Sequence, residues 1–265
     1  MSRATLVFLH ALGSSRREWE QVIDLLPGYD CIALDLPGFG DRPLANQTDP
    51  ARLAHWLTHE IAERQLTTSV LIGHSMGGKI VTLAAAHAVS GGPSLESVRG
   101  VVLVAASPPA PEPMDEDRRA EMMKWFAGGH ATYEDAAKFV DNNTADPLPQ
   151  ALREQAIADV MRCDPEASLA WLEHGSREDW SAEIGQINLS ALIIAGAKDG
   201  DLGEPAQRHL NAPHYRDARL EVISDAAHLI PYEKPQALAA LIDSHAAFVT
   251  GTSAAHTHLS QPSQS

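Results

Sequence analysis

A serine in a glycine-rich turn is the residue of this chain best placed to do covalent chemistry. Gly73, Ser75 and Gly77 form a G-x-S-x-G motif. An apolar run at residues 70–72 precedes the motif and a helical pattern follows it, which predicts a strand, a sharp turn and a helix. Glycines in such a turn avoid steric clashes, and the hydroxyl is held at a helix N-terminus, where negative charge is favoured. Ser75 is therefore the candidate nucleophile, and a merely tight turn is the alternative.

A serine hydroxyl is a weak nucleophile at neutral pH, so it needs a base within hydrogen-bond reach and a group that orients the base. Asp199 follows the apolar run 191–195, and His228 follows the apolar run 220–223 through small residues. Loops that follow parallel strands converge at one edge of a doubly wound sheet. We therefore predict that Ser75, Asp199 and His228 act as nucleophile, orienting acid and base, in the chain order Ser…Asp…His.

Four nearby polar residues are alternatives for these roles. Asp201 lies on the same loop as the proposed acid and competes with it, whereas Asp225 is interpreted as a turn-forming residue. His10 ends the first apolar run and His74 directly precedes the serine. His10 stands at a strand end beside the oxyanion loop, which favours a structural hydrogen-bonding role. Neighbouring side chains diverge on a tight turn, so His74 is also interpreted as structural.

The oxyanion of an acyl-transfer reaction needs two N–H groups that point at one position. The residue after the nucleophile, Met76, supplies one in this arrangement. The loop after the first apolar run, residues 10–15, should supply the other, and the amide of Leu12 is favoured. The prediction is an oxyanion hole made of the Leu12 and Met76 backbone amides.

Alternating strands and helices must position these groups. Continuous apolar strands joined by helices predict an α/β fold with a doubly wound, mostly parallel sheet that is covered on both faces. Residues 107–183 lack a strand pattern and contain four helical stretches, which predicts a helical cap inserted between residues 1–106 and 184–249 of the core. Residues 250–265 are predicted to be a disordered tail. Strands are expected at 6–9, 31–34, 70–72, 101–104, 191–195 and 219–223, and helices at 18–26, 50–65, 76–89, 115–126, 134–140, 150–161, 166–174 and 235–249.

The composition of the chain argues against several classes of binding partner. The 265 residues carry a net charge of −15, which argues against nucleic acid and against anionic membrane surfaces. The two cysteines have no metal-type spacing, and no metal site is predicted. No apolar run is long enough for a signal peptide or a membrane span, so a cytoplasmic location is expected. Oligomeric state is not predicted.

The chain resembles the α/β-hydrolase superfamily over nearly its whole length. The matching segments are residues 8–14, 35–40, 73–78, 196–199 and 227–228 with 233–235. Ala11 departs from the family's His-Gly at the oxyanion loop, and the family's first antiparallel hairpin is missing. The start of the chain is similar to the plant methylesterase and hydroxynitrile lyase branch. A lysine follows the catalytic histidine in those lyases, but Leu229 stands there in this chain.

The resemblance implies a hydrolytic triad without a cofactor and a small carboxylic ester as substrate, as in the pimeloyl-carrier-protein methyl ester esterases, which the chain also resembles. We expect hydrolysis through an acyl-enzyme. C–C bond hydrolysis, a lyase step or lactone opening with the same triad is the alternative, and a non-catalytic small-molecule receptor is a third. The large aromatics Trp125, Trp171 and Trp180 of the cap are candidates for lining the substrate pocket, with packing of the cap against the core as the competing interpretation.

Overall fold

A single parallel sheet forms the centre of the molecule. The structure is a computed structural model, and it describes residues 3–44, 48–89 and 95–251. Its six strands are arranged in the order β2-β1-β3-β4-β5-β6, and all five neighbouring pairs are parallel. This confirms the predicted doubly wound α/β class. The strands are β1 (Thr5–Leu9), β2 (Asp30–Leu34), β3 (Ser69–His74), β4 (Val98–Val104), β5 (Ile187–Gly196) and β6 (Tyr215–Ile223).

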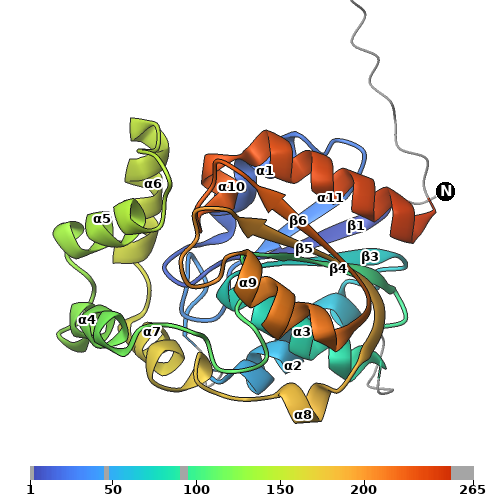
Figure 1. The fold of residues 1–265 in the computed structure, drawn as a ribbon, viewed down its shortest axis with the longest axis horizontal. Helices are drawn as coiled ribbons and strands as arrows, with labels where there is room; N and C mark the ends of the chain where they lie inside the picture. Colours follow the sequence, from blue (N-terminus) through green and yellow to red (C-terminus); the bar gives the residue numbers. More distant parts are fainter. Residues whose placement is uncertain (1–2, 45–47, 90–94, 252–265) are drawn as a thin grey trace, which may run out of the picture.

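Helices cover both faces of the sheet because its strands are apolar on both sides. Along β1, Leu6 and Phe8 point into one apolar cluster, and Val7 and Leu9 point into the other. Figure 1 shows α1 and α11 on one face and α2 and α3 on the opposite face. These helices are α1 (Glu20–Asp24), α2 (Pro50–Glu63), α3 (Met76–Val89) and α11 (Pro235–Thr250), and the 3-10 helix η1 (Arg16–Trp19) precedes α1.

Local sequence signals explain where several helices begin. The side chain of Asp49 accepts a hydrogen bond of 2.9 Å from the Arg52 amide, and Pro50 occupies the first turn of α2. The predicted helix at 18–26 is shorter and begins as η1, because Ser15 caps the chain already at that point. The helices therefore start at their caps, whereas their lengths differ from the apolar pattern by a few residues.

Residues 107–183 contain helices and loops and no strand, and the structure describes all of them. Figure 1 shows α4 to α7 beside the sheet, at the end where β5 and β6 finish. The stretch expected to be one helix at 166–174 is divided into an α-helix and a π-helical turn. The elements are α4 (Glu116–Ala127), α5 (Tyr133–Asn142), α6 (Gln150–Met161), α7 (Pro165–Ala170), η2 (Trp171–Gly175) and α8 (Ser181–Ile184).

Several short helices were not predicted, because each is too brief to give an apolar period. They are α9 (Glu204–Ala206), η3 (Gln207–Asn211), η4 (Ala212–His214) and α10 (Ile230–Glu233). Residues 252–265, which make up most of the predicted tail, lie outside the described residues. Within the described ranges, none of the helices has the length and apolarity needed to cross a bilayer.

Candidate active site

Ser75 lies on a strained turn between β3 and α3. Its φ angle is +51°, in the left-handed region that non-glycine residues rarely adopt. A Cβ at Gly73 would lie 2.4 Å from the Gly77 carbonyl oxygen, and a Cβ at Gly77 would lie 2.7 Å from the His10 carbonyl oxygen. The Ser75 amide donates to the Val104 carbonyl at 3.0 Å. The glycines thus permit a close approach that holds the serine at the end of the sheet.

The three side chains predicted to act together lie in one hydrogen-bonded row. The Nε2 atom of His228 lies 2.9 Å from Ser75 Oγ, and its Nδ1 atom lies 2.7 Å from Asp199 Oδ2. Asp199 also accepts a hydrogen bond of 3.1 Å from the Leu202 amide. An ionised carboxylate only accepts hydrogen bonds, so Nδ1 carries a proton and the neutral ring presents a lone pair at Nε2 to the serine hydroxyl.

Two loops cross closely to bring the acid and the histidine together. The loop after β5 carries Asp199, and the loop after β6 carries His228. The Lys198 amide donates to the Ala226 carbonyl at 2.9 Å, and a Cβ at Gly196 would lie 2.0 Å from the Ala227 carbonyl oxygen. The crossing therefore requires a glycine at the end of β5, where the backbone of the second loop passes.

The pKa values of His228 and Asp199 are shifted by their interaction with each other. Burial alone would lower the pKa of His228, but the charge of Asp199 and its hydrogen bond raise that pKa above the usual value for histidine. Burial alone would raise the pKa of Asp199, but the charge and the hydrogen bond of His228 hold it below its usual value. The carboxylate therefore stabilises the protonated imidazole.

The four alternative residues take other partners. The Asp201 carboxylate pairs with Arg118 at 2.6 Å, and Asp225 is exposed. His10 is fully buried, hydrogen-bonded through Nδ1 to the Ala11 carbonyl at 2.7 Å and through Nε2 to the Leu36 amide at 3.0 Å. His74 is also fully buried, and its two ring nitrogens pair with the Glu18 carboxyl group and the His228 carbonyl oxygen.

The two residues whose amides are expected to bind an oxyanion lie near the serine. Leu12 lines the same pocket as Ser75, and Met76 is the first residue of α3. In the described part of the chain, neither amide donates to a protein acceptor. Ala11 keeps a negative φ, and Gly13 next to this segment adopts the positive value of +72°. The departure from the family's His-Gly pattern is therefore tolerated without backbone strain at Ala11.

The pocket at Ser75 lies between the sheet edge and residues 107–183. Of the three tryptophans considered, Trp171 lines it. Trp125 packs edge-on against Phe139, and Trp180 donates from its indole nitrogen to Glu178 and lines a separate groove along α2 and α3. The pocket is lined by Leu12, Ser75, Glu112, Met114, Arg118, Met122, Phe139, Asn143, Trp171, Asp199, Asp201, Leu202 and His228.

Glu112 is a pocket residue that sequence reasoning missed. It is buried, and burial raises the pKa of its carboxyl, although its hydrogen bond with the Ser107 hydroxyl acts in the opposite direction. Arg118 was also missed; it donates to Asp201 and, at 3.0 Å, to the Asn143 side chain. Nothing in the sequence pattern marks these positions, because Glu112 stands between two prolines and Arg118 lies in a strongly charged helix start.

Lys79, in the helix that follows the serine, forms hydrogen bonds with residues 107–183. Its ammonium group is fully buried and donates to the carbonyl oxygens of Gly175 at 3.0 Å and Glu178 at 2.7 Å. Burial lowers the pKa of Lys79 to about 8. In the three described ranges, no three His, Cys, Asp or Glu side chains are grouped as metal ligands.

Comparison with known proteins identifies relatives of this chain. A pimeloyl-[acyl-carrier protein] methyl ester esterase of Neisseria meningitidis is 26% identical over 88% of this chain and 90% of its own length. A 2-succinyl-6-hydroxy-2,4-cyclohexadiene-1-carboxylate synthase of Pectobacterium atrosepticum is 28% identical over 73% of this chain and 77% of its own. Other matches to synthases of this name cover as little as 34% of the relative.

Solved structures share the fold. An esterase from Exiguobacterium antarcticum superposes with a TM-score of 0.82 at 20% identity, covering 92% of each chain. A family model described as the alpha/beta hydrolase family matches residues 6–241. With this match over most of its length, the chain belongs to the alpha/beta hydrolase family.

Proposed function

We propose that this protein is a serine carboxylesterase that cleaves a small carboxylic ester through an acyl-enzyme. The observation that carries the proposal is the row of hydrogen bonds from Asp199 to His228 at 2.7 Å and from His228 to Ser75 at 2.9 Å. A serine hydroxyl within reach of a basic nitrogen, whose ring is oriented by a carboxylate, is the arrangement that activates serine for acyl transfer.

The reaction follows from these groups. Ser75 Oγ attacks the ester carbonyl carbon while His228 Nε2 takes the hydroxyl proton. The amides of Leu12 and Met76 donate to the resulting oxyanion. When the tetrahedral intermediate collapses, the C–O bond to the alcohol breaks and His228 returns its proton to the leaving oxygen. A water molecule then attacks the acyl-enzyme by the same sequence, which releases the acid and restores the serine.

The pocket supports a neutral substrate. Arg118 is its cationic side chain, and that charge is already paired with Asp201. Glu112 and Asp199 add carboxyl groups, while Met114 and Met122 are among the apolar side chains of the wall. An anionic substrate group would enter without an unpaired cation to meet it, which costs free energy. We therefore propose an uncharged ester with apolar acyl and alcohol groups.

The relatives support ester chemistry, and the rival reactions are those that the same three side chains could catalyse on other substrates. A methyl ester esterase is among them, and so is a synthase whose named product is a carboxylate. A lyase step, C–C bond hydrolysis or lactone opening would use His228 mainly as an acid–base group. The absence of an unpaired cation in the described pocket lining disfavours a substrate that carries carboxylates.

A panel of methyl esters that share one acyl length tests the proposal. One ester has a neutral end, one a carboxylate and one an ammonium group. We expect the neutral ester to be cleaved with the highest kcat/KM, and Ser75→Ala to lose at least about 10³-fold in rate on it. A matched lactone and a C–C bond substrate serve as comparison. Ester cleavage that survives Ser75→Ala, or turnover confined to the comparison substrates, would contradict the proposal.

A further inference from the structure

His74 is a buried histidine that the proposed mechanism does not use. It is the last residue of β3, directly before Ser75, and its side chain is fully buried. An imidazole is polar at both nitrogens, so complete burial requires a hydrogen-bond partner for each. The two partners found are the carboxyl group of Glu18 and the backbone of His228.

One ring nitrogen holds the peptide unit of the candidate base. Nε2 of His74 lies 2.8 Å from the backbone carbonyl oxygen of His228. A carbonyl oxygen only accepts hydrogen bonds, so Nε2 carries a proton and donates it. The two imidazole rings lie with their centroids 5.2 Å apart. His74 thus holds the main chain of His228 by a hydrogen bond to its carbonyl oxygen.

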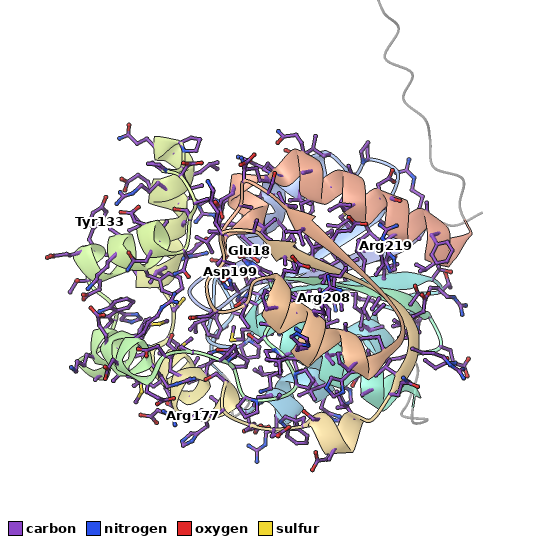
Figure 2. All side chains as sticks on the ribbon, in the orientation of Figure 1. Glu18, Tyr133, Arg177, Asp199, Arg208 and Arg219 are labelled. Carbon is purple, nitrogen blue, oxygen red and sulfur yellow. The ribbon has the colours of Figure 1, made fainter. Side chains whose placement is uncertain are left out.

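The other ring nitrogen is held by the carboxyl group of Glu18, a residue that lies far from His74 in the sequence. Nδ1 of His74 lies 3.1 Å from Glu18 Oε1, and Glu18, in η1, is 1% exposed. Figure 2 labels Glu18 and Asp199, and both lie toward the end of the sheet that faces α4 to α7. The remaining oxygen of Glu18 has no hydrogen-bond partner among the described residues.

The buried pair of Glu18 and His74 costs free energy that an apolar core would not. Burying a carboxyl group with one oxygen unpaired costs free energy, and apolar side chains of similar volume often stabilise a protein more than a buried polar pair does. Trp19, Val22 and Phe8 already form an apolar cluster next to this position. The polar pair therefore points to a role other than stability.

The remaining contacts of His228 show what His74 adds. The amide of His228 donates to the Asn143 carbonyl at 3.1 Å, so residues 107–183 hold its N–H side. Asp199 holds the ring through Nδ1. On the carbonyl side, the Ile230 amide of the same loop donates to the His228 oxygen at 2.9 Å, and His74 is the donor that ties this oxygen to the sheet. Asn143, Asp199 and His74 thus anchor His228 from three other parts of the chain, and together they fix the direction in which its Nε2 points.

We propose that Glu18 and His74 form a positioning pair that fixes the imidazole of His228 relative to Ser75 by holding the His228 carbonyl oxygen. The inference rests on the proposed function, because it assigns His74 a task only if His228 is the base. His74 transfers no proton and touches no substrate. Its removal lets the His228 peptide unit tilt, and a misplacement of about 1 Å in such a group costs about 10²-fold in rate.

Two amide substitutions of His74 separate this role from simple core filling. His74→Gln places its amide nitrogen near the position of Nε2, whereas His74→Asn places its nitrogen near Nδ1 and leaves the His228 carbonyl with the Ile230 amide as its remaining donor. The measurement is the second-order rate constant for labelling of Ser75 by a fluorophosphonate, together with the final labelled fraction. We expect His74→Asn to react roughly 10- to 100-fold more slowly and His74→Gln to recover most of the rate, with complete labelling of both variants.

His245 supplies the matched control. It is a buried histidine in α11, and its Nε2 has no hydrogen-bond partner within the described residues. His245→Gln should leave the labelling rate of Ser75 unchanged. Equal rates for folded His74→Asn, His74→Gln and the parent protein would overturn the proposal.

Glu18 gives a second test if His74→Asn fails to fold. Glu18→Gln retains an amide that can donate to Nδ1 of His74, whereas Glu18→Leu leaves that nitrogen without a partner. We expect the leucine variant to label about tenfold more slowly than the glutamine variant. Equal rates in these two folded proteins would also overturn the inference. A parent protein that is not labelled at Ser75 at all would instead refute the proposed function.

Discussion

The chemistry proposed for this protein depends on where single protons reside. Asp199 accepts the Nδ1 proton of His228, which leaves the lone pair of Nε2 facing the hydroxyl of Ser75. The same carboxylate raises the pKa of His228 by stabilising its charged form. The base is thereby stronger than an ordinary histidine, and it is also protonated at a higher pH.

The pH dependence of kcat/KM follows from this shift. His228 must be neutral to take the serine proton, so activity is lost as the pH falls through its raised pKa, above the usual histidine value of about 6.5. In Asp199→Asn the charge is gone, so the acid limb should move to lower pH while the rate falls by roughly 10³- to 10⁴-fold. A pH–rate profile of both proteins measures this. An acid limb of the same midpoint in the variant would contradict the assignment of Asp199.

Some site residues could be predicted from the sequence and others could not. Asp199 and His228 follow recognisable strands, so their loops could be assigned to one sheet edge. The sequence favoured Asp199 over Asp201, but it could not show what occupies Asp201, because the pairing of Asp201 with Arg118 depends on a helix more than eighty positions away in the chain. The contact between His74 and the His228 carbonyl is equally invisible to any local pattern.

At the scale of elements, the turn between β3 and α3 carries the strongest constraint. Its backbone approaches the end of β1 so closely that a Cβ at Gly77 would lie 2.7 Å from both the His10 and the Leu9 carbonyl oxygens. Main-chain atoms cannot move aside as the end of a flexible side chain can. The approach also sets the distance between Met76 and the loop that holds Leu12.

Gly77→Ala should therefore destabilise the fold. We expect the free energy of unfolding to fall by about 2 kcal/mol or more, because the added methyl group must displace the end of β1. Gly28→Ala is the matched control, since a Cβ at Gly28 meets no atom within 4 Å. That variant should stay within about 0.5 kcal/mol of the parent. Urea unfolding measures both, and equal midpoints for the two variants would show that the turn is less tightly packed than described.

The apolar periods predicted elements better than they predicted element boundaries. All six strands were expected: five contain a continuous apolar run, and β6 ends in an alternating segment, with Leu220, Val222 and Ile223 around Glu221. Strands β5 and β6 begin several residues earlier than expected, where Asn188 and Arg216 interrupt the apolar run. The π-helical turn at Trp171–Gly175 has no apolar signature of its own. Its hydrogen bonds are set by packing against α4 and by Lys79, which reaches the Gly175 carbonyl.

At the scale of the whole molecule, the site is assembled from two parts of the chain that the sequence separates. The sheet edge carries Ser75, Asp199 and His228, and residues 107–183 carry Glu112, Arg118 and Asn143. The hydrogen bonds of the Lys79 ammonium join these parts beneath the pocket. The sequence predicted that helices would occupy residues 107–183, but not which of their side chains would face the serine, because several of those helices have weak apolar faces and their packing is long-range.

Covalent labelling of the serine tests the central claim most directly. The protein is incubated with a fluorophosphonate, digested, and the modified peptide is identified by mass spectrometry while ester cleavage is followed in parallel. The account predicts one adduct, on Ser75, with activity lost in proportion to labelling and with labelling slowed at least about 10³-fold in His228→Gln. An adduct on a different residue, or ester cleavage that continues at full rate after Ser75 is modified, would contradict it.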